Sequence, residues 1–155
     1  MLNRDVKTQS TLAPLHSILG SQATVQEKML AICRWLHDER PQYDWVGFYI
    51  ARPAKKILEL GPYIGEPTEH TRIPYGRGIC GQVADSGKTL VIDDVAAQNN
   101  YLACSIHVKS ELVVPVFKDG RFVAELDIDS HSRSRFDQQE VTFLEAIAKE
   151  ITVLF

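Results

Sequence analysis

Apolar residues recur at helical spacing in two segments, one towards each end of the chain. The first begins at Thr24 and Glu27, which have the spacing of a capping box, and its apolar stripe is Val25, Met29, Ile32, Cys33 and Leu36. The second begins at Asp137, a favourable N-cap residue, and its stripe is Val141, Leu144, Ile147, Ala148, Ile151 and Leu154. These patterns predict two amphipathic helices, and they make Cys33 a small buried hydrophobic residue.

The chain between these helices favours strands. Four stretches are rich in aromatic and β-branched residues, at 45–51, 57–63, 112–117 and 121–129. They pair as two hairpins, the first turning at Lys55-Lys56 and the second at the strong two-residue turn Asp119-Gly120. Pro115 lacks a backbone donor, so it marks an edge, a bulge or an interrupted position of its strand.

The remaining segments are shorter. A loop at 64–74 precedes a glycine-rich turn and a short helix that ends near Ser86, and a strand follows at 89–92. Another short helix is expected at 15–19, within residues 1–20, which form an N-terminal extension. The order of elements predicts an α+β fold of one domain that spans the whole chain, with an antiparallel sheet and helices packed against one face.

Composition narrows the class of protein. The 155 residues carry a formal net charge of −3, with 45% hydrophobic and 24% charged residues, and no basic cluster, which argues against a nucleic-acid partner. No apolar stretch approaches the ~20 residues of a membrane span, and the polar N-terminus lacks the core of a signal peptide. We therefore expect a cytoplasmic protein with no membrane partner, in which three cysteines do not form a structural disulfide framework.

Cys80 lies in a glycine-rich turn that is expected to open a helix. Gly76, Gly78 and Gly81 permit a tight turn and a close backbone approach around it. Free amide groups at the start of the helix would stabilise a Cys80 thiolate. The alternative is a packed cysteine in a turn, and the sequence alone leaves both open.

Cys104 lies in a loop without strong periodicity. His107, three residues later, could serve it as a base or a hydrogen-bond donor, although a lone histidine is more often structural. Cys-x-x-His is also a metal-ligand spacing, but the further candidates His70 and Cys80 lie at irregular separations. A redox role is therefore favoured over a zinc site, and no metal is expected.

Three carboxylates lie on the second hairpin. Asp127 and Asp129 point to the same face of one strand, and Glu111 opens the strand before it. The simplest reading is a solvated polar face, whereas in a pocket these groups would repel one another and favour a cationic ligand such as an ammonium group. A two-residue turn at 119–120 sets Glu111 opposite Ile128, on the wrong face, unless a bulge near Pro115 shifts the register by one residue.

Several segments together resemble a known family, the GAF-domain free methionine-(R)-sulfoxide reductases. They are residues 45–49 (WVGFY), 72–81 (RIPYGRGICG), 103–104 (AC), 110–115 (SELVVP) and 126–130 (LDIDS). The resemblance covers most of the chain, from residue 45 to the C-terminal helix. It implies a GAF fold and the thiol-dependent reduction of free methionine-R-sulfoxide without a metal or organic cofactor.

The resemblance also implies roles for individual residues. Cys104 matches the cysteine that attacks the sulfoxide sulfur, and Cys80 matches a cysteine that resolves the sulfenic acid to a disulfide. Substrate-binding positions are expected at Glu111, Asp127 and Asp129, with Trp45 and Tyr49 as pocket walls, although core packing explains these two aromatic residues equally well. A thioredoxin-like reductant and a homodimer are the partners that the family implies.

The chain departs from the family at two places. Many members carry a further cysteine ten residues before the glycine-loop cysteine, and here that position is His70. The loop between Cys104 and Glu111 also lacks the family's small, Asp- and Asn-rich run. The competing function is a non-catalytic, sensory GAF domain that binds a small molecule, because fold alone does not fix function.

Overall fold

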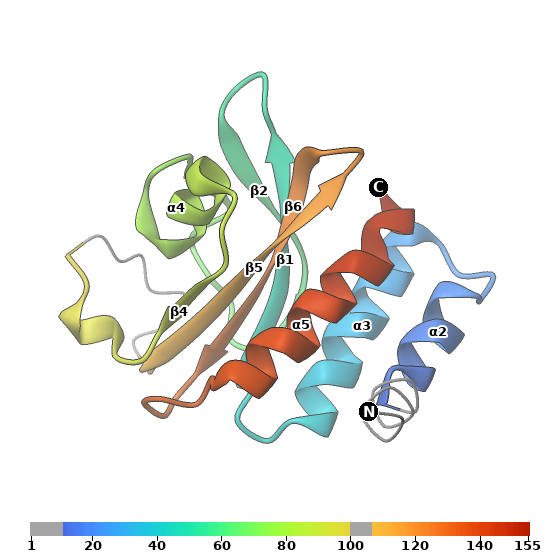
Figure 1. The fold of residues 1–155 in the computed structure, drawn as a ribbon, viewed down its shortest axis with the longest axis horizontal. Coiled ribbons are helices and arrows are strands. Elements are labelled where there is room, and N and C mark those ends of the chain that lie inside the picture. Colours follow the sequence, from blue (N-terminus) through green and yellow to red (C-terminus); the bar gives the residue numbers. More distant parts are fainter. Residues whose placement is uncertain (1–10, 100–106) are drawn as a thin grey trace.

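A six-stranded antiparallel sheet forms the centre of the molecule (Figure 1). The computed structural model describes residues 11–99 and 107–155. The strands follow the order β3-β2-β1-β6-β5-β4 across the sheet, and each neighbouring pair is antiparallel. Their bounds are β1 (Trp45–Arg52), β2 (Ile57–Ile64), β3 (Arg72–Pro74), β4 (Leu90–Ile92), β5 (Ser110–Lys118) and β6 (Arg121–Ser130).

Three helices lie on one side of this sheet, as the sequence predicted (Figure 1). They are α2 (Ala13–Leu19), α3 (Val25–Glu39) and α5 (Gln138–Glu150), and a 3-10 turn η2 (Ile151–Leu154) extends the last one. α3 and α5 pack on the sheet, and α2 packs on α3. Apolar residues of these helices form the larger core cluster with the sheet residues Val46, Phe48, Leu112, Leu126 and Ile128. The α+β fold class is confirmed.

A further helix, α4 (Gly78–Ser86), crosses the opposite face of the sheet (Figure 1). A second core cluster lies beneath it and includes Ile79, Val83, Leu58 and Val113. The expectation that helices pack on one face therefore holds for α2, α3 and α5, while α4 covers part of the other face. β3 lies in the stretch 64–74 that the sequence analysis expected to be a loop.

The helix starts form as the sequence predicted. Thr24 and Glu27 make a reciprocal capping box, in which each side chain accepts a hydrogen bond from the other residue's backbone amide. The Asp137 side chain accepts a hydrogen bond from the amide of Glu140 at 3.0 Å. These caps satisfy amide groups that have no partner within the helix.

The second hairpin contains the bulge that the acidic residues require. Asp119 and Gly120 both have positive φ, 51° and 76°, as a type I′ turn demands. The register then shifts by one residue between Val116 and Phe117. Glu111 consequently lies opposite Asp129 instead of Ile128, which corrects the expectation from simple hairpin counting.

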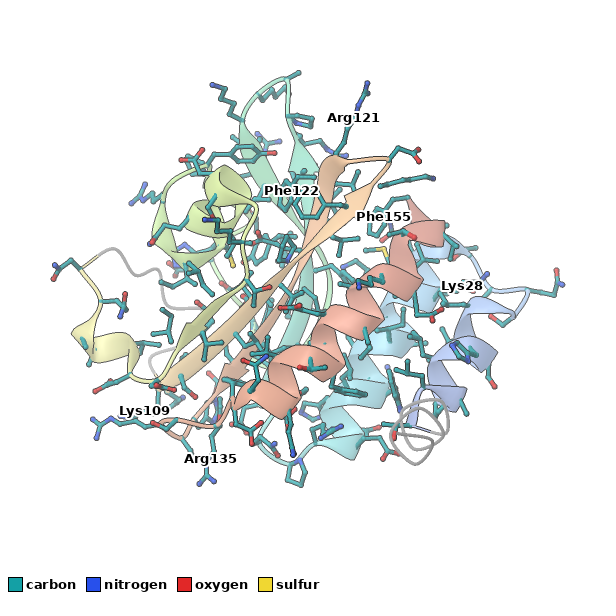
Figure 2. All side chains as sticks on the ribbon, in the orientation of Figure 1. Lys28, Lys109, Arg121, Phe122, Arg135 and Phe155 are labelled. Carbon is teal, nitrogen blue, oxygen red and sulfur yellow. The ribbon has the colours of Figure 1, made fainter. Side chains whose placement is uncertain are left out.

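Basic side chains lie at the periphery of the molecule. Lys109, Arg121 and Arg135 are exposed and point outward, as Figure 2 shows. Within the described ranges, no helix combines the length and the apolar character needed to span a bilayer.

Candidate active site

Four acidic side chains gather on the face of the sheet that α4 covers. Glu125, Asp127 and Asp129 alternate along β6 and therefore share that face, and Glu111 of β5 pairs with Asp129. All four are buried, with Glu111 2% exposed and the others 0%. This excludes the solvated polar face that was the simplest reading of the sequence. Glu125, Asp127, Asp129 and Glu111 are called the acid cluster below.

Burial and repulsion from neighbouring carboxylates favour the protonated forms of Glu111 and Glu125. Burial, followed by the charges of Asp127 and Asp129 and hydrogen bonds to them, raises the pKa of Glu111 well above its ordinary value. Burial, together with the charge of Asp127, raises the pKa of Glu125, and the neighbouring Cys80 thiol offsets part of that rise. The raised pKa favours the protonated form of Glu111, which is thus suited to donate a proton as well as to bind a cation.

The Cys80 thiol points into the acid cluster. It donates a hydrogen bond to Asp127 Oδ2 at 3.4 Å, and the Cys80 side chain is 6% exposed. The expected helix start is present, since α4 begins at Gly78, and Cys80 lies in its first turn. The thiol also faces carboxylates, whose negative charges oppose the stabilisation of a thiolate by the amide groups at the start of the helix.

Close backbone contacts hold the first turn of α4 against the preceding loop. The amide of Gly76 donates to the carbonyl of Gly81 at 2.7 Å. A Cβ atom on Gly81 would lie 2.6 Å from the carbonyl oxygen of Pro74, closer than real Cβ contacts. Glycine at position 81 therefore allows the approach that puts Cys80 over the acid cluster.

Trp45 and Tyr49 lie on the same face as the acids. In the register of β1 and β6, Trp45 pairs with Asp129 and Tyr49 pairs with Glu125. Both rings are buried and stack with centroids 6.4 Å apart. The Tyr49 hydroxyl donates a hydrogen bond to the carbonyl of His70 at 2.9 Å. Because of the strand register, both rings border the acid cluster, and both also pack in the second core cluster.

A small cavity adjoins the cluster. Its volume is ≈ 10 Å³, and His70, Cys80 and Glu111 are among its lining residues. A space of this size holds about one water molecule or a single small ion. The larger hollows, such as one of ≈ 410 Å³ along α5 and β5, contain neither a thiol nor a group of buried acids.

The structure describes the predicted histidine, His107, but not the other predicted thiol. Cys104 lies outside the described residues, so its distance from Cys80 stays a prediction. His107 is exposed, and its Nδ1 lies 3.1 Å from Glu66 Oε1 on the loop after β2. Its ring also faces that of His131, with centroids 5.6 Å apart.

Sequence reasoning missed two residues of this region. Glu125 continues the alternation of Asp127 and Asp129 by one step, so the period of two along the strand could have identified it. Tyr75 lies next to the glycine-rich turn, and burial together with the charge of Glu125 raises its pKa. Nothing in the local sequence pairs Tyr75 with Glu125, because the turn and the strand meet only in the folded chain.

Comparison with known proteins assigns the family. Residues 9–154 match the sequence profile of the GAF domain, so the chain belongs to the GAF domain family. It is 40% identical over 116 residues to Protein YtsP of Bacillus subtilis, covering 75% of this chain and 71% of that protein. It is 30% identical over 116 residues to the free methionine-R-sulfoxide reductase of Escherichia coli, covering 75% and 68%.

A solved structure agrees with this grouping. The free methionine-R-sulfoxide reductase from Neisseria meningitidis, determined in complex with its substrate, superposes with a TM-score of 0.84 at 34% identity, covering 91% of this chain and 83% of that one. The resemblance to the free methionine-(R)-sulfoxide reductases within the GAF family is thereby confirmed.

Proposed function

We propose that the protein reduces free L-methionine-(R)-sulfoxide to methionine. The observation that carries the proposal is the buried acid cluster with the Cys80 thiol directed into it. Buried carboxylates repel one another, and an ammonium group from a free amino acid relieves that repulsion. Two of the relatives named above are free methionine-R-sulfoxide reductases, and this activity suggests that the reacting group of the amino acid is a sulfoxide.

Cys104 is the nucleophile of the first chemical step. Its thiolate attacks the sulfoxide sulfur, and the sulfoxide oxygen takes up a proton. The attack forms a bond between the two sulfur atoms. The protonated oxygen then moves from the methionine sulfur to the Cys104 sulfur as the S–S bond breaks, so methionine leaves as the thioether and Cys104 becomes a sulfenic acid. Glu111 is suited to supply the proton, because burial and the neighbouring carboxylates raise its pKa and so favour its protonated form.

The second step restores the thiol. The Cys80 sulfur attacks the sulfenic sulfur of Cys104, a disulfide forms, and the hydroxyl leaves as water with the proton of Cys80. A thioredoxin-like dithiol then reduces this disulfide by exchange. With His70 at the position of the family's further cysteine, Cys80 is the resolving thiol that we assign.

The same site explains a preference for the free amino acid. A methionine sulfoxide residue inside a peptide has no free ammonium group to place among Glu111, Asp127 and Asp129. The cavity of ≈ 10 Å³ accommodates about the ammonium group alone. Substrate binding therefore requires that the cavity between α4 and the sheet widens, and hydrogen exchange of the α4 amides should change when the substrate is added.

A coupled assay tests the function. Thioredoxin, thioredoxin reductase and NADPH are mixed with the protein and free methionine-R-sulfoxide, and Cys104→Ser is the control. The proposal expects turnover that the variant lacks. Equal rates for the two proteins would overturn it, and a thermal shift with ligand but no turnover would support the sensory GAF domain instead.

The oligomeric state and the cellular location of the enzyme are proposed on the same basis. We infer a homodimer that assembles through its helices, as the family implies, and a cytoplasmic location, where a thioredoxin-like reductant is available. Light scattering coupled to size-exclusion chromatography tests the dimer, and a mass of 17.5 kDa at all concentrations would contradict it.

A further inference from the structure

The thiol and two carboxylates of the acid cluster are arranged as metal ligands. One ligand atom each from Cys80, Glu111 and Asp127 lies within 4.8 Å of the other two, and all three residues are buried. The measured separation from Cys80 Sγ to Asp127 Oδ2 is 3.4 Å. Tetrahedral zinc with a sulfur ligand at about 2.3 Å and an oxygen ligand at about 2.1 Å separates them by about 3.6 Å. The pair therefore already has the spacing of two zinc ligands.

A fourth buried group points to a cation independently of these three. Glu125 is 0% exposed, and apart from the neighbouring Cys80 thiol its carboxyl oxygens have no hydrogen-bond partner within the described part of the chain. It lies two residues before Asp127 on the same strand face and next to the Cys80 thiol. Burying an unpaired carboxyl group is costly unless a ligand compensates it.

We propose that Cys80, Glu111 and Asp127 bind one divalent ion of the zinc class, which competes with the substrate ammonium. The mixed sulfur and oxygen ligands select this class, because calcium and magnesium prefer oxygen ligands alone. The adjoining cavity of ≈ 10 Å³, bordered by Cys80 and Glu111, offers room for a water molecule in the fourth position.

The bound ion would inhibit the proposed reaction in two ways. It holds Cys80 as a metal thiolate, so that this sulfur no longer resolves the sulfenic acid. It also occupies carboxylates of the ammonium site. This consequence rests on the proposed function, whereas the metal site itself depends only on the reduced thiol and the two carboxylates.

Direct binding tests the site without any need for turnover. The full-length chain is reduced, freed of metal with a chelator and titrated with cobalt, whose charge-transfer absorbance reports a thiolate ligand. Zinc affinity is then measured by competition with a chromophoric chelator. We expect one ion per chain, loss of the charge-transfer band in Cys80→Ser, and at least 100-fold weaker zinc binding in both Cys80→Ser and Glu111→Gln.

Two control variants separate this site from other metal-binding groups. Cys33→Ser changes a buried cysteine in the core on the other face of the sheet, and His131→Ala removes one ring of the surface pair with His107. Both should bind zinc as the parent protein does. Stoichiometric binding that survives Cys80→Ser, binding that His131→Ala abolishes, or the absence of binding to the folded, reduced chain would each overturn the proposal. Circular dichroism of Cys80→Ser and Glu111→Gln establishes that they are folded.

Discussion

Replacing Glu125 with methionine should stabilise the protein. Glu125 is fully buried, its carboxyl oxygens have no hydrogen-bond partner in the described parts of the chain apart from the neighbouring Cys80 thiol, and burial raises its pKa. Methionine has a similar length and no polar atom. Removing an unsatisfied buried polar group of this kind gains about 1–3 kcal/mol even when the carboxyl is neutral.

The gain should grow as the pH rises. The pKa of Glu125 is higher in the folded state than its ordinary value of 4.5, so the unfolded chain loses this proton first. Below pH 4.5 both states are protonated, and ionisation adds no penalty to folding. Above pH 4.5 the penalty increases by up to about 1.4 kcal/mol per pH unit until the folded pKa is reached. Glu125→Met removes this penalty, so its advantage is larger at pH 7 than at pH 5.

Urea unfolding at pH 5 and pH 7 measures the effect, and Glu145→Met is the matched control because Glu145 is exposed on α5. We expect the control to change the free energy of unfolding by no more than about 0.5 kcal/mol. For a chain of this length, a gain of 2 kcal/mol corresponds to about 4–8 °C in Tm. A Glu125→Met protein that is less stable than the parent at pH 7, or equally shifted at both pH values, would refute the reasoning.

Three further predictions concern the supports of the fold and the substrate. Tyr43 is buried, and its hydroxyl donates a hydrogen bond to Glu140. Tyr43→Phe removes this bond and should lower the free energy of unfolding, measured in urea, by about 1.5–3 kcal/mol. An unchanged free energy of unfolding would show that the bond does not stabilise the fold. Gly81→Ala should lower the free energy of unfolding by about 1–3 kcal/mol, because the added Cβ would lie 2.6 Å from the Pro74 carbonyl oxygen. The control Gly20→Ala, whose nearest contact is at 3.3 Å, should lower it by less than half as much. Equal losses for the two variants would argue against a tight turn at Gly81. N-acetyl-methionine-R-sulfoxide lacks the ammonium group, so its kcat/KM as a substrate should be at least 10-fold lower than that of the free amino acid. Comparable kcat/KM values would show that the protein does not recognise the ammonium group.

Local sequence signals predicted most of the fold. Thr24 and Glu27 carry the information for a helix start within four residues, and Asp119-Gly120 carries that for a hairpin turn. The short strand β3 was missed, because three residues paired with β2 have no periodicity of their own. Such a strand forms only when a distant partner supplies its hydrogen bonds.

The candidate site was predictable only in part. Alternation along β6 put Asp127 and Asp129 on one face, but their burial depends on α4, which lies about fifty residues away in sequence. The position of Glu111 depends on a one-residue bulge between Val116 and Phe117, which the residue types at these positions do not specify. Proximity of Cys80 to the acids is likewise a property of the tertiary packing.

The most direct test of the central claim is the turnover of free methionine-R-sulfoxide by the parent protein and by Glu111→Gln, measured with thioredoxin and NADPH. The account predicts that the parent turns over and that the variant loses about 10- to 150-fold in kcat/KM, as expected when a hydrogen bond to a charged group is lost. Identical kcat/KM values for the two proteins, or no turnover by the folded, reduced parent, would contradict it.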